Sequence, residues 1–198
     1  MGLKIEYEKG QTPLDEEESQ GLLIKTISTR KELDEFEQQN IEKAIEWTLS
    51  RKFKPAKIAS EDFIKELHYK MYGEVWKWAG EFRHSNKNIG CNWQQVGTLL
   101  KQLNDDLIFW IANKTYPDEE IAIRYKHRIV SIHCFPNGNG RHSRLIADII
   151  ITHVFSTPVF SWGAKDLNKN NEVRNNYITA LKKADAGDVA PLVLFSHT

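Results

Sequence analysis

The sequence predicts an all-α protein, built as a bundle of helices with one small β-hairpin. Apolar residues recur at spacings of three and four through most of the chain, which is the period of an amphipathic helix. Residue types that cap helices stand at the start of these stretches. A single internal segment, residues 81–93, lacks the helical period. We therefore expect helices that pack on one another around a shared core.

Residues 1–28 are predicted to form an N-terminal arm, and a clear helix follows it. Thr29 with Glu32 three positions later predicts a capping box, in which each side chain binds the other residue's backbone N–H. The helical period then continues to about Arg51. Pro55 is expected to stop any further helix there.

Ser60 is expected to cap the next helix, whose first turn carries acidic residues that the helix dipole favours. Segment 81–93, by contrast, is interrupted by Asn, Gly and Ser, which predicts a short hairpin, with a plain surface loop as the alternative. Later helices are expected over 93–111, from Pro117 to His133, over 139–155, over 170–184 and from Asp188 to Phe195.

Bulk composition limits the class of protein. A chain of 198 residues is one domain, or one domain with an arm. Hydrophobic residues make up 40% of it, so it is globular rather than disordered. A formal net charge of +0 argues against a nonspecific nucleic-acid or membrane binder, which would need a basic surplus. We expect no membrane span, and the two cysteines, Cys91 and Cys134, fit a reducing cytoplasm.

One stretch, residues 132–144, joins two apolar helical segments and carries most of the recognisable chemistry. Pro136 lacks an N–H and ends the incoming helix or forces a turn. Gly138 and Gly140 allow a tight turn and a close approach to a ligand. Because the next helix begins near Asn139, its free N–H groups and its positive dipole end face the loop, and such a helix start binds anions.

Charged side chains complete this candidate anion site. Arg141 and Arg144 lie on one helical face at i, i+3 spacing, so both can hold the same anion. His133, across the loop, can be neutral near pH 7 and accept a proton. The pattern predicts a phosphate cradle that faces a general base. The structural alternatives are a helix-end histidine, a plain glycine turn, and an arginine that pairs with Asp148 four positions later.

These residues resemble the Fic/Doc family motif, His-x-Phe-x-Asp/Glu-Gly-Asn-Gly-Arg-x-x-Arg. Seven positions match: His133, Phe135, Gly138, Asn139, Gly140, Arg141 and Arg144. Matches at that many fixed positions would arise by chance roughly once in 10⁹. Further segments resemble a prokaryotic branch of the family called mobile mystery protein B, and they lie at 12–15, 36–41, 78–83, 86–90 and 184–185.

The resemblance implies a domain organisation. Residues 29–198 would form a Fic-like helical domain with a hairpin flap near the active site. Within it, the resemblance implies a candidate inhibitory helix at 29–51, a Fic core at 57–157 and C-terminal helices at 158–198. In this family the flap, here around residues 82–91, holds a peptide of the target protein by adding a strand to it, so backbone hydrogen bonds supply the affinity.

The resemblance also implies an activity, the transfer of AMP from ATP to a Ser, Thr or Tyr hydroxyl of a target protein. Such a chain is a protein adenylyltransferase, with ATP as its substrate. His133 would be the catalytic base, and the Asn139 amide would face phosphate oxygens. The implied nucleotide-binding residues are Gly138, Asn139, Gly140, Arg141 and Arg144.

Asn137 departs from the family pattern, which has an acid at this position that usually holds Mg²⁺. A neutral amide oxygen binds a hard cation less well than a carboxylate, so Asn137 is expected to be a poor or outer-shell ligand of Mg²⁺. A Cys134–His133 nucleophile pair is disfavoured, because adjacent residues rarely face each other. The spacing also fits no zinc pattern, although these residues could supply ligands: His127, His133, Cys134 and His142.

A glutamate of the first long helix is a candidate inhibitory residue. Many Fic proteins are held off by a glutamate, in the pattern Ser/Thr-x-x-x-Glu-Gly/Asn, that pairs with the second motif arginine. Here Glu37 has a similar place, although Leu33 and Gln38 depart from the pattern. The hypothesis is that Glu37 reaches Arg144 and suppresses transfer, and the alternative is a solvated helix residue.

Two other functions stay open at this stage. A Fic-type transferase could move another phosphate-containing group, because the orientation of the ligand decides which phosphorus is attacked. A nucleotide-binding regulatory module without turnover is the second. Asn137 favours that module, and His133 counts against it, because a pure binder needs no base.

Overall fold

Side-chain caps begin several of the helices in the computed structural model, which describes residues 13–163 and 171–198. The predicted capping box at Thr29 is present, with Glu32 binding back to the Thr29 backbone. Ser60 likewise accepts a hydrogen bond from the Phe63 backbone N–H and starts the next helix as predicted. The first half of the predicted arm, residues 1–12, lies outside the described residues.

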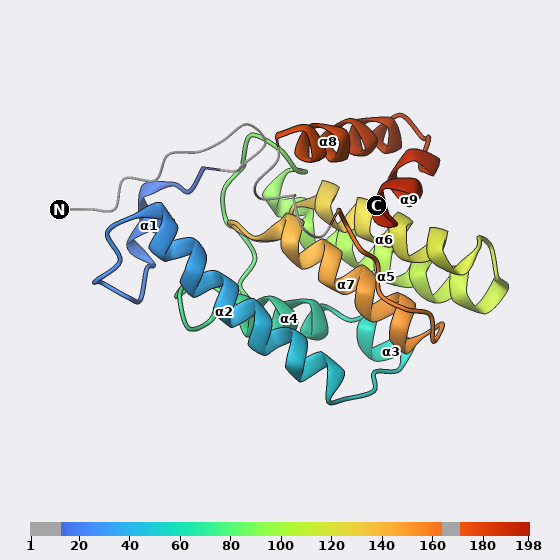
Figure 1. Ribbon diagram of the computed structural model, residues 1–198, viewed down its shortest axis with the longest axis horizontal. Coiled ribbons are helices and arrows are strands. Elements are labelled where there is room, and N and C mark those ends of the chain that lie inside the picture. The colour runs from blue at the N-terminus through green and yellow to red at the C-terminus, as the bar shows by residue number, and fades with distance from the viewer. Residues whose placement is uncertain (1–12, 164–170) are drawn as a thin grey trace.

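The all-α prediction is confirmed for the described ranges (Figure 1). The helices there are α1 (Glu16–Gln20), α2 (Arg30–Leu49), α3 (Pro55–Ile58), α4 (Glu61–Tyr72), α5 (Val96–Asn113), α6 (Asp118–Ile132), α7 (Asn139–His153), α8 (Asn171–Asp185) and α9 (Ala190–Ser196), with a 3₁₀ turn at Trp93–Gln95.

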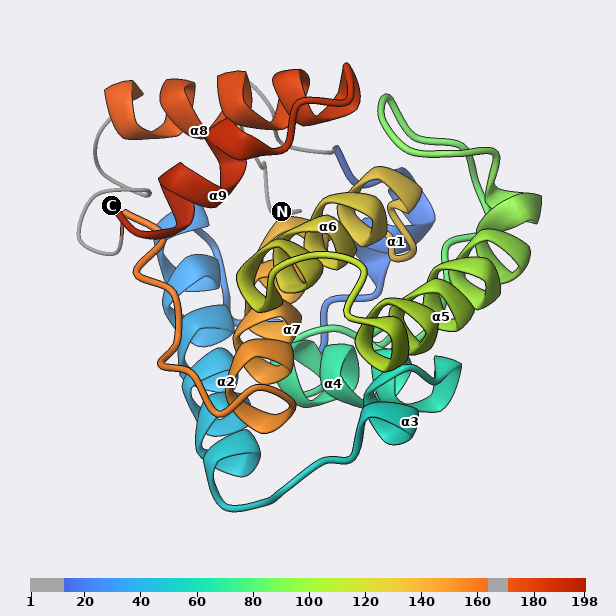
Figure 2. The ribbon, with the colours of Figure 1, turned by 90° about the vertical axis from the view of Figure 1, so that its right-hand side faces the viewer.

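The antiparallel pair α6 and α7 lies at the centre of the bundle (Figures 1 and 2). Helix α5 packs on α6, α2 packs on α4, and α8 with α9 forms a pair that reaches α6 through α9. Helix α7 is buried on nearly all sides, because its core residues, such as Ile146 and Ile150, are completely inaccessible to solvent. The loop between α6 and α7 therefore lies on a rigid scaffold.

Two short helices were not predicted. Pro55 begins α3 instead of preventing a helix, because proline is tolerated in the first helical turn, where its missing N–H costs nothing. The acidic run after Asp15 forms α1, because the Asp15 side chain and Glu18 make a second capping box. Proline at a first helical position and a local capping box therefore begin two helices that the sequence period did not indicate.

The hairpin predicted within 81–93 is replaced by a loop without paired strands. We call residues 81–92 the flap, and Figure 2 shows its two legs in green beside α1 and the start of α5. The backbone N–H groups of its legs bond to the end of α6 and to the loop after it, since Cys91 N donates to the Ile132 carbonyl and Arg83 N to the Cys134 carbonyl. These external bonds satisfy backbone groups that a hairpin ladder would otherwise pair.

None of the helices in 13–163 and 171–198 combines the length and the apolar character that a membrane crossing requires.

Candidate functional site

His133 ends α6 in a left-handed backbone conformation, with φ 60° and ψ 62°. Its N–H still bonds to the Ile129 carbonyl, so this residue closes the helix and turns the chain. The side chain is only 4% exposed. Burial, followed by the nearby charge of Arg83, lowers the pKa of His133 to about 4, although a hydrogen bond to the Val130 backbone raises it. The imidazole is therefore neutral, with a basic nitrogen, near pH 7.

The loop after His133 is held from inside by Asn139. The Asn139 side chain accepts from Phe135 N at 3.0 Å and donates to the Phe135 carbonyl at 2.8 Å. The Asn139 side chain is 5% exposed, and both of these hydrogen bonds hold the loop closed from inside. This corrects the expectation that the Asn139 amide faces phosphate oxygens. The backbone N–H of Asn139 still belongs to the first turn of α7.

A buried histidine on α4 supports the same loop. His68 donates from Nε2 to the Asn137 carbonyl at 3.1 Å and accepts at Nδ1 from Gly80 N at 3.0 Å, which requires the neutral ring. Its ring stacks on Phe135 with 3.7 Å between centroids. Burial, followed by the charge of His142, holds the pKa of His68 well below its usual value. The backbone of Asn137 is therefore fixed by a side chain that keeps one tautomer.

The two motif glycines serve different purposes. Gly138 caps α7 at φ 77°, and a Cβ there would lie 2.6 Å from the Tyr72 ring, so only glycine fits. A Cβ on Gly140 would meet nothing within 4 Å. The first helical bond of α7 is from His142 N to the Gly138 carbonyl. The N–H groups of residues 139–141 therefore precede the helical ladder at an end where the dipole favours anions.

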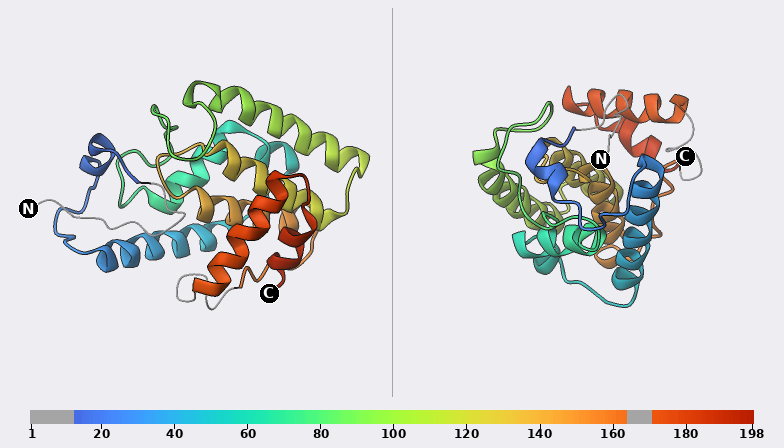
Figure 3. Two further views of the ribbon diagram at one scale, coloured as in Figure 1. Left: turned by 90° about the horizontal axis from the view of Figure 1, so that it is seen from above. Right: turned by 90° about the vertical axis from the view of Figure 1, so that its left-hand side faces the viewer.

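Arg141 is paired with Glu37 of α2. One carboxylate oxygen of Glu37 lies 2.7 Å from Arg141, and the other accepts from Trp76 Nε1 at 2.6 Å. Figures 2 and 3 show α2 running beside α7, which brings these residues together. Glu37 is 4% exposed, so it is not a solvated helix residue. The pairing corrects the hypothesis that Glu37 reaches Arg144.

Arg144 instead faces the C-terminal helices. Its guanidinium lies 5.7 Å from the centre of the Tyr177 ring on α8. The Tyr177 hydroxyl accepts from the buried Lys126 Nζ at 2.5 Å. Burial raises the pKa of Tyr177, but Lys126 and Arg144 together lower it below its usual value. Asp148, the alternative partner of Arg144, accepts from Phe160 N and Trp162 Nε1 and so anchors the segment after α7.

Zinc and thiol chemistry find no support around the motif. No group of three or more His, Cys, Asp or Glu residues that could hold a metal ion occurs in 13–163 or 171–198. Asn137 Oδ1 accepts from Gly138 N at 2.6 Å, so the only metal candidate of the motif already has a backbone partner. Cys134 is fully buried, and burial raises the pKa of its thiol, which makes it a poor nucleophile.

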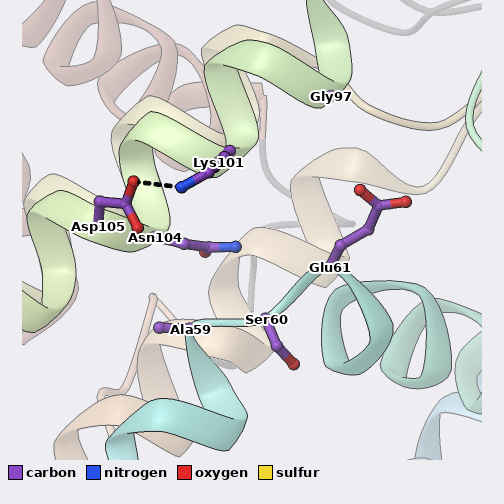
Figure 4. A pocket seen from close by; sticks show the side chains of 7 residues that line it. All are labelled: Ala59, Ser60, Glu61, Gly97, Lys101, Asn104 and Asp105. Atoms are coloured by element: carbon purple, nitrogen blue, oxygen red, sulfur yellow. Dashed lines mark hydrogen bonds and ion pairs between the residues drawn. The ribbon is translucent and has the colours of Figure 1, made fainter.

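A separate shallow pocket lies between the start of α4 and the side of α5. Figure 4 shows its lining side chains, including the ion pair of Lys101 with Asp105 at 2.8 Å. Its other lining residues are Ala59, Ser60, Glu61, Gly97 and Asn104. The motif residues do not contribute to it, and it is distinct from the candidate site.

Three residues of the site were not predicted from the sequence. Trp76 holds Glu37, Tyr177 contacts Arg144, and Arg83 bonds to the end of α6. Trp76 is buried and stacked on Trp78. No local pattern predicts these contacts of Tyr177 and Arg83, because Arg144 and His133 are distant from them in the sequence.

Comparison with known proteins places the motif in a family. Residues 58–151 match the Fic/DOC family. The "Protein adenylyltransferase Fic" of Drosophila willistoni is 28% identical over 137 residues, which cover 67% of this chain and 26% of that protein. The protein of the same name from Aedes aegypti is 29% identical over the same shares. The chain thus spans only 26% of the length of these curated relatives.

Solved structures show the same fold. The Caenorhabditis elegans protein Fic-1 (residues 134–508) has a TM-score of 0.61 at 24% identity, over 80% of this chain and 45% of that one. The Bartonella tribocorum effector BepC, solved with bound AMPPNP, has a TM-score of 0.67 at 15% identity, over 92% of this chain and 97% of that one.

Proposed function

The chain carries a Fic/DOC family domain at residues 58–151, and from this we propose that it is a protein adenylyltransferase, which transfers AMP from ATP to a Ser, Thr or Tyr hydroxyl of a target protein. One observation supports this most strongly. A buried histidine with a lowered pKa ends α6, and one short loop separates it from the start of α7, which carries two arginines, so a proton acceptor and a candidate anion site flank the same loop.

His133 would act as the base. A bond forms between the target's hydroxyl oxygen and the α-phosphorus of ATP, and the bond from that phosphorus to the bridging oxygen breaks. The hydroxyl proton goes to the basic nitrogen of His133, and pyrophosphate leaves with the bond's electron pair. Because the pKa of His133 is about 4, it begins the reaction neutral and able to accept that proton.

The start of α7 would hold the phosphates. Backbone N–H groups of residues 139–141 precede the helical ladder, and they supply donors without any rearrangement. The missing side chain of Gly140 leaves room for an oxygen to approach them. Arg141 and Arg144 would hold the β- and γ-phosphates, which concentrates positive charge where the leaving pyrophosphate becomes more negative.

The motif does not form a dedicated Mg²⁺ site on its own. Asn137 offers a neutral oxygen that already accepts from Gly138 N, and such an oxygen is a weak ligand for a hard cation. Any Mg²⁺ is expected to arrive with the triphosphate and to depend on its oxygens.

Glu37 would keep this site in an inhibited state. Its pairing with Arg141 neutralises the first motif arginine, and Trp76 holds the carboxylate in place. Phosphates and Glu37 would compete for the same guanidinium, so ATP would bind weakly or in an unproductive orientation until α2 shifts. Glu37 pairs here with the first motif arginine, whereas the family pattern implies the second. The expected consequence, suppression of transfer, is the same.

A target protein would dock at the flap, around residues 82–91, whose legs border His133.

We place the protein in a reducing cytoplasm, which its two free thiols at Cys91 and Cys134 support.

Two forms of labelled ATP test the function. The Glu37→Gly variant is incubated with a bacterial lysate and ATP labelled either at the α- or at the γ-phosphate, with Glu37→Gly/His133→Ala as control. We expect label in protein only from the α-position, and only when His133 is present. Label only from the γ-position would mean transfer of phosphate, and ATP binding without any label would mean a regulatory module.

A further inference from the structure

Arg83 is a buried cation that donates to four backbone carbonyls and, through a longer contact, to the Cys91 sulfur. Its side chain is 1% exposed. Nε donates to the His133 carbonyl at 2.6 Å, and Nη2 donates to the Ile132 carbonyl at 3.4 Å. On the flap, Nη1 donates to Ser85 at 2.7 Å and Nη2 to Cys91 at 2.5 Å. One planar guanidinium therefore bonds to the end of α6 and to both legs of the flap.

These bonds act at a strained point of the chain. His133 has φ 60°, a conformation that residues with a side chain adopt rarely. The carbonyls at a helix end also lack helical partners, and Arg83 supplies donors to those of Ile132 and His133. The flap then passes so close that a Cβ on Gly90 would lie 2.6 Å from the His133 Cβ.

We infer that Arg83 is a positioning residue, which holds the His133 backbone in its left-handed conformation and fixes the flap beside it. This inference rests on the proposed role of His133 as the base. If the guanidinium were removed, His133 and the flap would no longer be held together. The His133 side chain would then lose its alignment with both ATP and the target hydroxyl. Lysine, which has one nitrogen, cannot span the same set of carbonyls.

Charge gives Arg83 a second, separable effect on His133. After burial, the positive charge of Arg83 is the largest influence that lowers the pKa of His133, and Lys87 adds a smaller one. Both cations belong to the flap, and Lys87 is itself paired with Glu18 of α1 at 2.5 Å. Removal of the Arg83 charge should therefore raise the pKa of His133, whereas Arg83→Lys should leave it nearly unchanged.

The test compares Arg83→Gln and Arg83→Lys with wild type and with Arg124→Gln, and transfer and ATP affinity are measured with all four in the Glu37→Gly background, because Glu37 is proposed to inhibit the wild-type site. Arg124 is a matched control on α6 itself, because its guanidinium pairs with Glu120. Thermal unfolding reports the folded fraction, and calorimetry reports ATP affinity. NMR follows the imidazole titration of His133, which the His133→Ala spectrum identifies among the seven histidines.

We expect Arg83→Gln to raise the pKa of His133 and Arg83→Lys to leave it near the wild-type value. At saturating ATP, both should lower the transfer rate by roughly tenfold or more per folded molecule, with ATP affinity within about twofold. Arg124→Gln should match wild type in all readings. If Arg83→Gln does not fold, the rate and the ATP affinity of Arg83→Lys carry the test.

The inference is overturned if Arg83→Gln leaves the His133 titration unchanged, or if the rate falls only in proportion to the folded fraction or to ATP affinity. Amide hydrogen exchange does not depend on transfer. If wild type and Glu37→Gly both transfer nothing, the proposed function fails, and the exchange rates of the Cys91 and Cys134 amides still decide the positioning role, because they should rise in Arg83→Lys and should match wild type if Arg83 positions nothing.

Discussion

The carboxylate of Glu37 lies 2.7 Å from the guanidinium of Arg141, so a side chain of α2 pairs with the first arginine of the α7 motif. The other carboxylate oxygen is fixed by Trp76 at 2.6 Å. In the proposed function this pair is an internal competitor of the ATP phosphates, and it makes the position of α2 a control on activity.

Removal of the Glu37 charge should activate the protein. In Glu37→Gln the side chain keeps its size but no longer neutralises Arg141, so ATP should bind more tightly and the transfer rate should rise by roughly tenfold or more. Titration calorimetry and labelled ATP measure the two effects. Glu35→Gln, on the exposed side of the same helix, is the control. Equal ATP affinity in Glu37→Gln and wild type would rule out the competition.

Loss of the hydrogen-bond donor of Trp76 should activate the protein less than removal of the Glu37 charge does. Trp76→Phe keeps most of the buried ring but removes the hydrogen bond to Glu37, so Glu37 should leave Arg141 more readily. Because a hydrogen bond to a charged group is worth about 1.5–3 kcal/mol, unfolding free energy should fall by a comparable amount. Transfer should rise above wild type but stay below Glu37→Gln. A rate below wild type, after correction for the folded fraction, would contradict this order.

The two motif glycines should respond differently to alanine. Gly138→Ala forces a Cβ to within 2.6 Å of the Tyr72 ring at φ 77°, so it should lower the unfolding free energy by about 1–2 kcal/mol or more. Gly140→Ala meets nothing within 4 Å and should leave stability unchanged or slightly higher, while ATP affinity falls because the methyl group fills space at the helix start. Chemical denaturation and calorimetry separate these effects. Loss of stability in Gly140→Ala would contradict the assignment of that space to the ligand.

The pH dependence of transfer should follow the neutral form of His133. Its pKa is lowered to about 4, so the base is neutral above that value and protonated below it. The transfer rate should therefore be independent of this group from about pH 5 upward and should fall as the pH drops through about 4. Rates at saturating ATP, measured over the range in which the protein stays folded, test this. A fall centred near the ordinary histidine pKa would contradict a buried neutral base.

Acid should destabilise the fold through its buried histidines. Burial lowers the pKa of His142 to about 4, as for His133, and burial also holds the pKa of His68 well below its usual value. The unfolded chain binds protons near its ordinary histidine pKa, so their contribution to stability is complete above that value and is lost as the pH falls towards 4. Each of these histidines adds up to about 1.4 kcal/mol per pH unit to the slope of unfolding free energy against pH. Burial raises the pKa of Asp148 to about 7. Protonation of this carboxyl as the pH falls therefore stabilises the fold and offsets part of the loss. Urea unfolding from pH 7 to 5 measures the net loss, and a flat or rising stability would contradict it.

The sequence predicted those parts of the fold and the site that depend on local chemistry. The capping box at Thr29 and the cap at Ser60 set two helix starts, because their partners lie within three residues. The start of α7 after Gly138 was predicted for the same reason, since glycine freedom and helix ends are local properties. The assignment to the mobile mystery protein B branch stays a prediction.

Contacts between distant elements could not be predicted in the same way. The crossing of α2 and α7 decides whether Glu37 meets Arg141 or Arg144, and that crossing depends on packing across the whole bundle. The flap was expected as a hairpin, but its legs bond to the α6–α7 loop through Arg83, whose carbonyl partners carry no sequence signal. The roles of the individual site residues are proposals for the same reason.

The central claim is tested most directly by mass spectrometry of the modified protein. Glu37→Gly is incubated with ATP and a lysate, and modified peptides are compared with those from Glu37→Gly/His133→Ala. We predict peptides that carry AMP on a Ser, Thr or Tyr hydroxyl, present with His133 and absent without it. Peptides that carry phosphate alone, or no adduct while calorimetry still detects ATP binding, would contradict the account.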